Sequence, residues 1–307
     1  MADQVILHHY ENSPYAEKIR LMFGLSKSSW ASLLSPAWPP RPNVDPLSGG
    51  YRRIPIAQIG ADIFCDSTLI AREVANLNKQ PLLDPTTING EARALMNFAE
   101  EQGFFSAIIA VPPTKLLATM IKNFGPIGAF RFAKDRSGIL KGGSTRAPSS
   151  DDAREVMQKL FSMLNEHLAT QAWVYGEQPS IADFTVYHPI WLYLNCSGKI
   201  PAEATRVLTW FEKIAAIGQG DRTEIGQADA FAAARDSEPR ALPVSTEATD
   251  HELGSTVAVA PEDYGVVPVT GHLAAVTENR IVLARESTQF GLVHVHFPRA
   301  GYSIAAA

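Results

Sequence analysis

The stretch VILHHYENSPYAEKIR, residues 5–20, decides the N-terminal fold because it changes abruptly from a strand pattern to a helix pattern. Residues 5–9 are strand-forming and largely apolar. Asn12 and Ser13 then offer capping side chains, and Pro14 takes the first helical position, where proline has no hydrogen bond to lose. The apolar stripe of the helix comprises Ile19, Leu21, Met22 and Leu25. We therefore expect a β-strand followed by an α-helix.

The segments downstream extend this pattern to a small α/β unit over residues 1–80. Residues 35–50 are crowded with prolines, which excludes a central strand or a helix and predicts a long surface loop. Residues 54–59 and 62–65 predict a hairpin around Gly60. A helix follows from Asp66. The predicted order is β-α-β-loop-β-β-α, in one α/β layer arrangement.

The remainder of the chain changes character twice. Residues 90–238 show helical periodicity, clearest over 151–169, and 223–235 predict a last, alanine-rich helix. Beyond Pro239 the β-forming residues cluster between turn residues, and 250–307 predict four or five short strands, as a small barrel or as a sheet packed on the helical domain. The fold class is therefore α+β multidomain, with domains at 1–80, 90–238 and 250–307.

Composition excludes several functional classes. The chain has 307 residues, a formal net charge of −5 and two cysteines, Cys65 and Cys196. Two distant cysteines predict neither a disulfide framework nor a zinc site, and they fit a reducing, cytoplasmic location. The scattered basic residues give no reason to expect nucleic acid as a partner. No apolar run is long enough to predict a membrane span.

Three motifs in order carry a family resemblance: SPYAEKIR at 13–20, RRIPI at 52–56 with Asp66-Ser67 about ten residues on, and SIAD at 180–183. This set resembles the soluble glutathione transferases of the serine type over residues 4–220, and the β-rich tail has no place in their usual architecture. The resemblance implies a thioredoxin-like glutathione-binding domain, an all-helical second domain and a homodimer. It also implies glutathione as co-substrate, with no metal and no organic cofactor.

Ser13 is the candidate catalytic residue. A thiol titrates near 8.5, so lowering its pKa by about two units requires roughly 2.7 kcal/mol of selective anion stabilisation. A hydroxyl donor to a charged acceptor supplies about 1.5–3 kcal/mol, and a helix N-terminus adds about 0.3–1 kcal/mol. Ser13 combines both, although a plain helix cap is the alternative. Tyr10 and Asn12 are rival thiol donors.

The resemblance implies a binding role for residues around the hairpin. Pro55 resembles the family's cis-proline, which exposes the backbone of Ile54 to the cysteinyl residue of glutathione. Asp66 and Ser67 resemble the pair that holds the γ-glutamyl end, with a helix cap as the alternative. Arg41 or Arg53 would meet the glycyl carboxylate. Apolar walls for the electrophile are expected from Tyr15, Phe104, Phe105 and Ile109, with plain core packing as the alternative.

Three further features are interpreted as structural. The sequence SIAD is a capping box that starts a buried helix. Cys65 lies in an apolar strand beside an acidic residue and is assigned to the core. His294 and His296 share a strand face, but no third ligand is evident, so surface or partly buried histidines are expected and not a metal site.

The leading functional hypothesis is conjugation of glutathione to a hydrophobic electrophile. The alternatives are a non-catalytic glutathione-binding or scaffold protein, suggested by the added tail, and a glutathione-dependent peroxidase or deconjugating activity. The absence of cysteine at Ser13 argues against thiol exchange, because a mixed disulfide needs a sulfur nucleophile.

Overall fold

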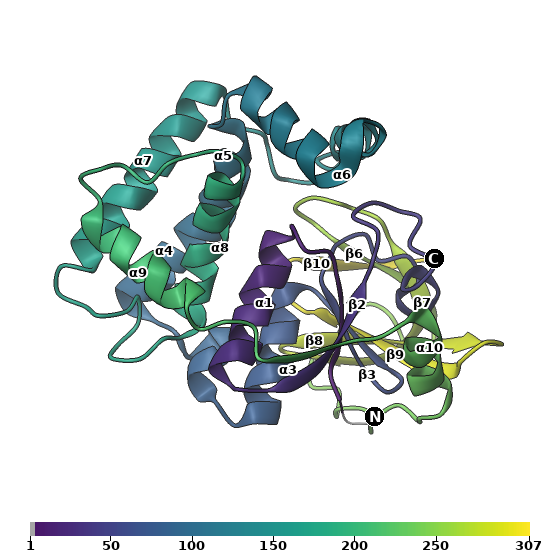
Figure 1. The fold of residues 1–307 in the computed structure, drawn as a ribbon. Helices are drawn as coiled ribbons and strands as arrows, with labels where there is room; N and C mark the ends of the chain where they lie inside the picture. Colours follow the sequence, from purple (N-terminus) through teal and green to yellow (C-terminus); the bar gives the residue numbers. More distant parts are fainter. Residues whose placement is uncertain (1–3) are drawn as a thin grey trace.

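The computed structural model describes residues 4–307 and begins with a thioredoxin-like unit (Figure 1). Its elements are β1 (Ile6–His9), α1 (Pro14–Leu25), β2 (Ser29–Leu34), α2 (Asp45–Ser48), β3 (Ile56–Ile59), β4 (Asp62–Cys65) and α3 (Ser67–Asn78). Apart from α2, the order of strands and helices, β-α-β-β-β-α, is as predicted. The proline-rich loop, however, contains the one-turn helix α2, which the prediction had excluded. Pro46 lies in its first turn, where a missing N–H costs nothing.

The second unit is all-helical, as the sequence predicted, and lies beside α1 and α3 (Figure 1). It comprises α4 (Gly90–Phe98), the π-helical turn η3 (Ala99–Gly103), α5 (Phe104–Ile109), α6 (Pro113–Arg136), α7 (Ser150–His167), α8 (Ile181–Asn195) and α9 (Thr205–Ala215). Helix α6 is kinked at Gly125, whose φ of 69° and following Pro126 interrupt the helical hydrogen bonds. Two 3-10 turns, η1 (Pro81–Leu83) and η2 (Pro85–Thr87), connect the two units.

After α9 the chain adds a strand, β5, at one edge of the sheet and then passes to the opposite edge, where β6–β10 lie. Strand β5 (Asp221–Glu224) and helix α10 (Gln227–Arg235) come first, so the helix expected from residue 223 starts four residues later, after a short strand. Gly226 precedes α10, and its backbone N–H is bonded by the Asp229 carboxylate. The C-terminal extension then forms β6 (Thr256–Pro261), β7 (Val269–Thr277), β8 (Arg280–Ser287), β9 (Gly291–Pro298) and β10 (Tyr302–Ala306).

The extension is neither a separate barrel nor a sheet on the helical domain, the two arrangements the sequence had suggested. It continues the thioredoxin sheet, giving one ten-stranded sheet in the order β10-β6-β7-β8-β9-β4-β3-β1-β2-β5. The join is the parallel pairing of β4 with β9, in which Ile63 lies opposite Val295. An edge strand presents unpaired backbone N–H and C=O groups to which another strand can bond, and β9 bonds to the edge of β4 in this way.

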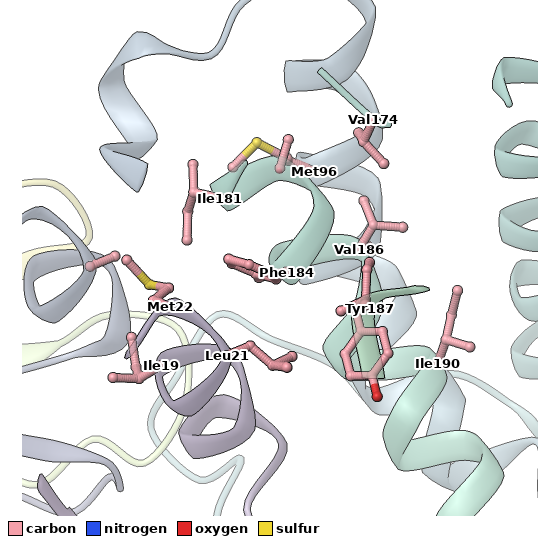
Figure 2. Close-up of a cluster of buried hydrophobic side chains, with 14 of the residues drawn as sticks. Ile19, Leu21, Met22, Met96, Val174, Ile181, Phe184, Val186, Tyr187 and Ile190 are labelled. Carbon is pink, nitrogen blue, oxygen red and sulfur yellow. The ribbon is translucent and has the colours of Figure 1, made fainter. Parts of the chain in front are cut away.

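The main hydrophobic core joins the first two units (Figure 2). Ile19 and Met22 of α1 pack near Ile181 and Phe184 of α8, and all four side chains are buried. The extension has its own core with β3, β4 and α10, including Ile63, Val295 and Phe297. The two cores lie on opposite faces of the sheet, since Phe64 of β4 belongs to the first core and Ile63 of the same strand to the second. The extension is therefore an integral part of the fold.

The predicted capping box at the start of α8 is present. The Ser180 hydroxyl accepts from Ala182 N, and the fully buried Asp183 carboxylate accepts from Ser180 N at 2.9 Å, Val174 N at 2.8 Å and Trp210 Nε1 at 2.9 Å. Burial raises the pKa of Asp183, while these donors compensate. The motif is therefore a folding element, as expected.

Two buried histidines on β1 are held neutral. Burial lowers the pKa of His8 to about 4, although its Nε2 is bonded to Gln58 Oε1 at 2.9 Å. Burial also lowers the pKa of His9 to about 3, with Arg20 adding to the effect. Arg20 donates to His9 Nδ1, so Nε2 carries the proton and donates to Ser32 Oγ. A proton on His9 Nδ1 would break the bond from Arg20, and a proton on His8 Nδ1 would place an uncompensated charge in the buried interior.

Within residues 4–307, no single helix combines the length and apolarity needed to cross a membrane; only the bent combination of Gly90–Ile109 with α6 reaches that threshold, when the two are taken together.

We predict that acid destabilises the fold through these histidines. His8 has a depressed pKa in the folded state, so stability is complete above about pH 6.5 and is lost as the pH falls toward 4. Between pH 7.5 and pH 5, His8 alone should remove roughly 2 kcal/mol of unfolding free energy. Urea unfolding at both pH values should show a smaller pH difference for His8→Gln than for wild type. The exposed His272→Gln should behave as wild type, and an unchanged difference in His8→Gln would refute the assignment.

Candidate functional site

A cavity of about 480 Å³ lies between the thioredoxin-like unit and the helical unit. Most of its wall is apolar, and four expected electrophile-pocket residues line it, namely Tyr15, Phe104, Phe105 and Ile109. Tyr15 packs against Phe104 with ring centroids 4.7 Å apart, so the aromatic side chains form one surface. A largely apolar cavity of this size suits a small hydrophobic ligand.

Ser13 lies at the boundary of this cavity and is almost completely buried. Its side-chain oxygen accepts from Ala16 N at 3.3 Å, so it is the N-cap of α1. A hydroxyl oxygen that accepts a bond keeps its own proton for donation. Ser13 thus combines the cap with a donor directed by a helix N-terminus, and the two interpretations offered by the sequence are compatible.

The two rival thiol donors are placed differently. Tyr10 lines the cavity with Ser13, and its carbonyl accepts from Ser13 N at 3.0 Å. Asn12 is exposed and does not line the cavity. Tyr10 therefore stays within reach of a ligand in the cavity, whereas Asn12 does not.

The residues expected to bind glutathione gather at the start of α3. The Ile54–Pro55 peptide bond is cis, and both residues line a small subsite with Asp66 and Ser67. Asp66 has φ 76° and ψ 134°, a strained conformation for a non-glycine residue, and its Oδ1 accepts from Thr68 N at 2.9 Å. Backbone strain of about 1–3 kcal/mol is typical of functional sites. The strained cap holds the second carboxylate oxygen toward the subsite.

Arg53 forms the centre of a polar network at this subsite. Its guanidinium lies 3.4 Å from Asp66 Oδ2 and contacts Asp263, and its Nη2 donates to the Tyr264 carbonyl at 2.6 Å. The same guanidinium lies 4.0 Å from the centre of the Tyr264 ring. Asp66 Oδ2 also accepts from the Tyr302 hydroxyl at 3.0 Å. Residues from both ends of the chain therefore complete one ionic site.

Arg41, the other arginine proposed for a carboxylate, is committed to the backbone. It is almost fully buried, and its guanidinium donates to the carbonyls of Pro36 at 2.9 Å and Arg52 at 2.9 Å. Burial lowers its pKa to about 10. Although Arg41 lines the cavity, these bonds assign it to holding the proline-rich loop, which leaves Arg53 as the arginine at the subsite.

Sequence reasoning missed the contribution of the extension. Tyr264 lines the large cavity, the subsite and a neighbouring polar cavity of about 360 Å³. Its ring lies 5.2 Å from Phe105, and burial raises its pKa to about 12, so it stays protonated. Residues on α6 and after it were also missed, among them Met120, Phe132, Arg136 and Leu140. No signal in the sequence places the tail over the first domain, since that depends on long-range strand pairing.

A second polar cluster lies where the extension joins the sheet. His294 and His296 of β9 are buried, not surface or partly buried as expected, and Asp62 of β4 supplies the third group that the sequence had not revealed. His296 Nε2 is 2.7 Å from Asp62 Oδ1, whereas the Nδ1 atoms of both histidines have no hydrogen-bond partner among the described residues. Three such groups are a possible metal-ligand set.

The charged residues around this cluster favour a structural role instead, in which the cluster attaches the C-terminal extension to β4. Arg240 donates to Asp62 Oδ2 from its backbone N at 2.9 Å and from Nε at 3.3 Å, and Glu73 pairs with both Arg240 and Arg280. Burial opposes ionisation of Asp62, but His296 and Arg240 outweigh it and hold the pKa of this carboxyl below its usual value. A metal cation would compete with the Arg240 guanidinium for the Asp62 carboxylate.

Family comparisons agree with this arrangement. The N-terminal domain model of glutathione S-transferase matches residues 7–81, and the C-terminal domain model matches residues 115–217. A search of curated proteins found no match. Together, the two matched domains in sequence order and the site geometry show that the chain belongs to the glutathione transferase superfamily.

Solved structures include similar chains. A GST-like protein from Pseudomonas syringae has 28% sequence identity and a TM-score of 0.74, and the match covers 99% of both chains, so it includes the C-terminal extension. A glutathione S-transferase domain-containing protein from Marinobacter aquaeolei VT8 has 17% identity and a TM-score of 0.45, covering 69% of this chain and 97% of that one. A glutathione S-transferase from Rhodospirillum rubrum F11 has 12% identity and a TM-score of 0.48, covering 69% and 88%.

We predict that Asp62→Asn loosens the attachment of the extension. The substitution removes the carboxylate bonded to the buried His296 and one of the two carboxylates that pair with Arg240, the other being Glu73, which should cost about 2–3 kcal/mol of unfolding free energy. Urea unfolding measures the loss, and Glu286→Gln, an exposed carboxylate on β8, is the matched control. Equal unfolding midpoints for Asp62→Asn and wild type would show that the cluster does not hold the extension.

Proposed function

We propose that this glutathione-transferase-type protein conjugates the thiolate of glutathione to a hydrophobic electrophile. The observation that carries the proposal is the position of Ser13, a residue at the boundary of the apolar cavity whose hydroxyl oxygen accepts a bond from Ala16 N and so keeps its proton for donation. The subsite at the start of α3 is beside the same cavity, since Tyr15, Arg53 and Ile54 line both. A thiol held from that subsite would meet an electrophile held among the aromatic side chains.

In the proposed reaction the glutathione thiol releases its proton to solvent, and the Ser13 hydroxyl donates a hydrogen bond to the thiolate. The sulfur attacks an electrophilic carbon and a C–S bond forms. In a substitution the leaving group departs with its electron pair, whereas in an addition to an α,β-unsaturated carbonyl the π electrons move to the carbonyl oxygen and the enolate takes a proton from solvent. Ser13 and the N-terminus of α1 lower the thiol's pKa because both stabilise the anion. The remaining rate acceleration comes from proximity, since the cavity holds glutathione and the electrophile close together and orients them for attack.

The tripeptide is held by groups of matching chemistry. The Ile54 backbone pairs with the cysteinyl residue, the Asp66 carboxylate suits the ammonium group, and Ser67 at the start of α3 suits the α-carboxylate. Arg53 is the remaining cation for a carboxylate of the ligand. All of these roles use residues of the first domain.

We predict that Ser67→Ala weakens glutathione binding at least tenfold, or about 1.4 kcal/mol, because it removes a hydroxyl donor to the α-carboxylate. Isothermal titration calorimetry with reduced glutathione measures the change. Ser150→Ala is the matched control, since Ser150 has the same first helical position in α7 and lines none of the cavities described. Absence of binding to wild type at millimolar glutathione contradicts the proposed function.

We predict that Ser13→Ala lowers kcat/KM about 10- to 100-fold near pH 7 and shifts the ascending limb of the pH–rate profile upward by one to two pH units. The assay uses aryl halides and α,β-unsaturated carbonyls as electrophiles. Ser180→Ala also removes a helix cap, from α8, and should lower stability by about 1 kcal/mol without moving the profile. An unmoved profile in Ser13→Ala would assign thiolate stabilisation to another group, with Tyr10 next in line.

A further inference from the structure

The loop between β6 and β7, residues 262–268, reaches from the extension to the helical unit. Ser144 N donates to the Glu262 carbonyl at 2.9 Å, Thr145 N donates to the Asp263 carbonyl at 3.0 Å, and Gly265 N donates to the Ile139 carbonyl at 2.6 Å. These three backbone bonds pair the loop with the segment that follows α6. The β6–β7 loop therefore bridges the two units beside the candidate site.

The close approach of the two segments depends on Gly143. A Cβ atom at this position would lie 1.8 Å from the Asp263 carbonyl oxygen and 2.5 Å from its carbonyl carbon. Since both atoms belong to backbone, no side-chain rotation could relieve the clash. A glycine at residue 143 is what allows the β6–β7 loop to lie in its observed position.

Within this loop, Tyr264 lies on the route that glutathione would follow. It lines the large cavity beside Ser13, the subsite beside Ser67, and the polar cavity on the far side of Asp66. The subsite itself measures about 30 Å³, which suits one or two water molecules and is too small for a γ-glutamyl group. The polar cavity beside it is larger, at about 360 Å³, and also reaches Asp66 and Ser67. Since Tyr264 lines all three spaces, a ligand that continues from the start of α3 through the subsite toward Ser13 would displace the Tyr264 side chain.

Asp263, the neighbouring residue, offers Arg53 the same chemical group that glutathione would offer. The guanidinium contacts the Asp263 carboxylate on one side and the Asp66 carboxylate on the other. Asp263 is only half-buried, so it can return to solvent when a ligand carboxylate takes its place. The exchange of one carboxylate for another leaves the charge around Arg53 unchanged.

From these contacts we propose that Asp263 and Tyr264 are specificity-determining residues that compete with glutathione for the subsite at Arg53, Asp66 and Ser67. This inference rests on the proposed function. Glutathione binds when the β6–β7 loop withdraws and frees the subsite. If the loop is closed in about nine-tenths of molecules, the apparent affinity for glutathione is about tenfold below that of the open site.

The test compares affinities for reduced glutathione by calorimetry in the full-length chain. Asp263→Asn removes the competing charge, Tyr264→Ala removes the ring from the subsite, and Gly143→Ala displaces the loop without altering a side chain of the site. Two matched controls are Gly138→Ala, where a Cβ meets nothing closer than 4.0 Å, and Val267→Ala, an exposed residue of the same loop. Thermal unfolding of each variant verifies that it is folded.

The competition model predicts dissociation constants several-fold to about tenfold lower in Asp263→Asn, Gly143→Ala and Tyr264→Ala than in wild type, with both controls unchanged. Equal or weaker binding in these variants, beside measurable wild-type binding, overturns the competition and leaves the proposed function intact. No binding by wild type or any folded variant defeats the proposed function itself. Because Gly143→Ala changes no ligand-contacting side chain, its result separates loop displacement from the loss of a direct contact.

Discussion

The parallel pairing of β4 with β9 is the constraint on which the rest of the structure depends. It turns a C-terminal extension into the continuation of a thioredoxin-like sheet, with Ile63 opposite Val295 and the Asp62–His296 bond beside them. Because α3 begins directly after β4, strands added at this edge bring the β6–β7 loop and β10 toward the N-terminus of α3. Tyr302 and Asp263 reach Asp66 and Arg53 for this reason.

The N-terminus of α3 thus contacts residues of the extension and is also the proposed binding site for glutathione. In the described structure the Asp66 carboxylate accepts bonds from Thr68 N, Arg53 and Tyr302, so its charge is already compensated within the chain. A ligand gains from this site only the difference between its own contacts and those it replaces. The extension therefore bears on affinity and selectivity, whereas Ser13, at the start of α1 and outside the Arg53 network, bears on the thiol. The oligomeric state and cellular location stay predictions.

Local signals in the sequence were sufficient for most of the first domain. The Ser13-Pro14 cap and the capping box at Ser180 act within a few residues and were predicted from those residues, whereas the cis bond before Pro55 was expected from the family resemblance. The one-turn helix at Asp45 and the strand at Asp221 were missed, because both are short and the strand forms only by pairing with β2. Tyr264 and Asp62 were missed as partners because their contacts lie about 200 residues away along the chain.

Competition between glutathione and the β6–β7 loop is tested most directly by amide hydrogen exchange at Ser144, Thr145 and Gly265, with and without saturating glutathione. These amides hold the β6–β7 loop to the segment after α6. We expect glutathione to slow exchange at Ser67 and Thr68 and to speed it at Ser144, Thr145 and Gly265, because the ligand displaces the loop. Slower or unchanged exchange at those three amides, together with protection at Ser67, would contradict this expectation, because the loop would then remain in place beside bound glutathione.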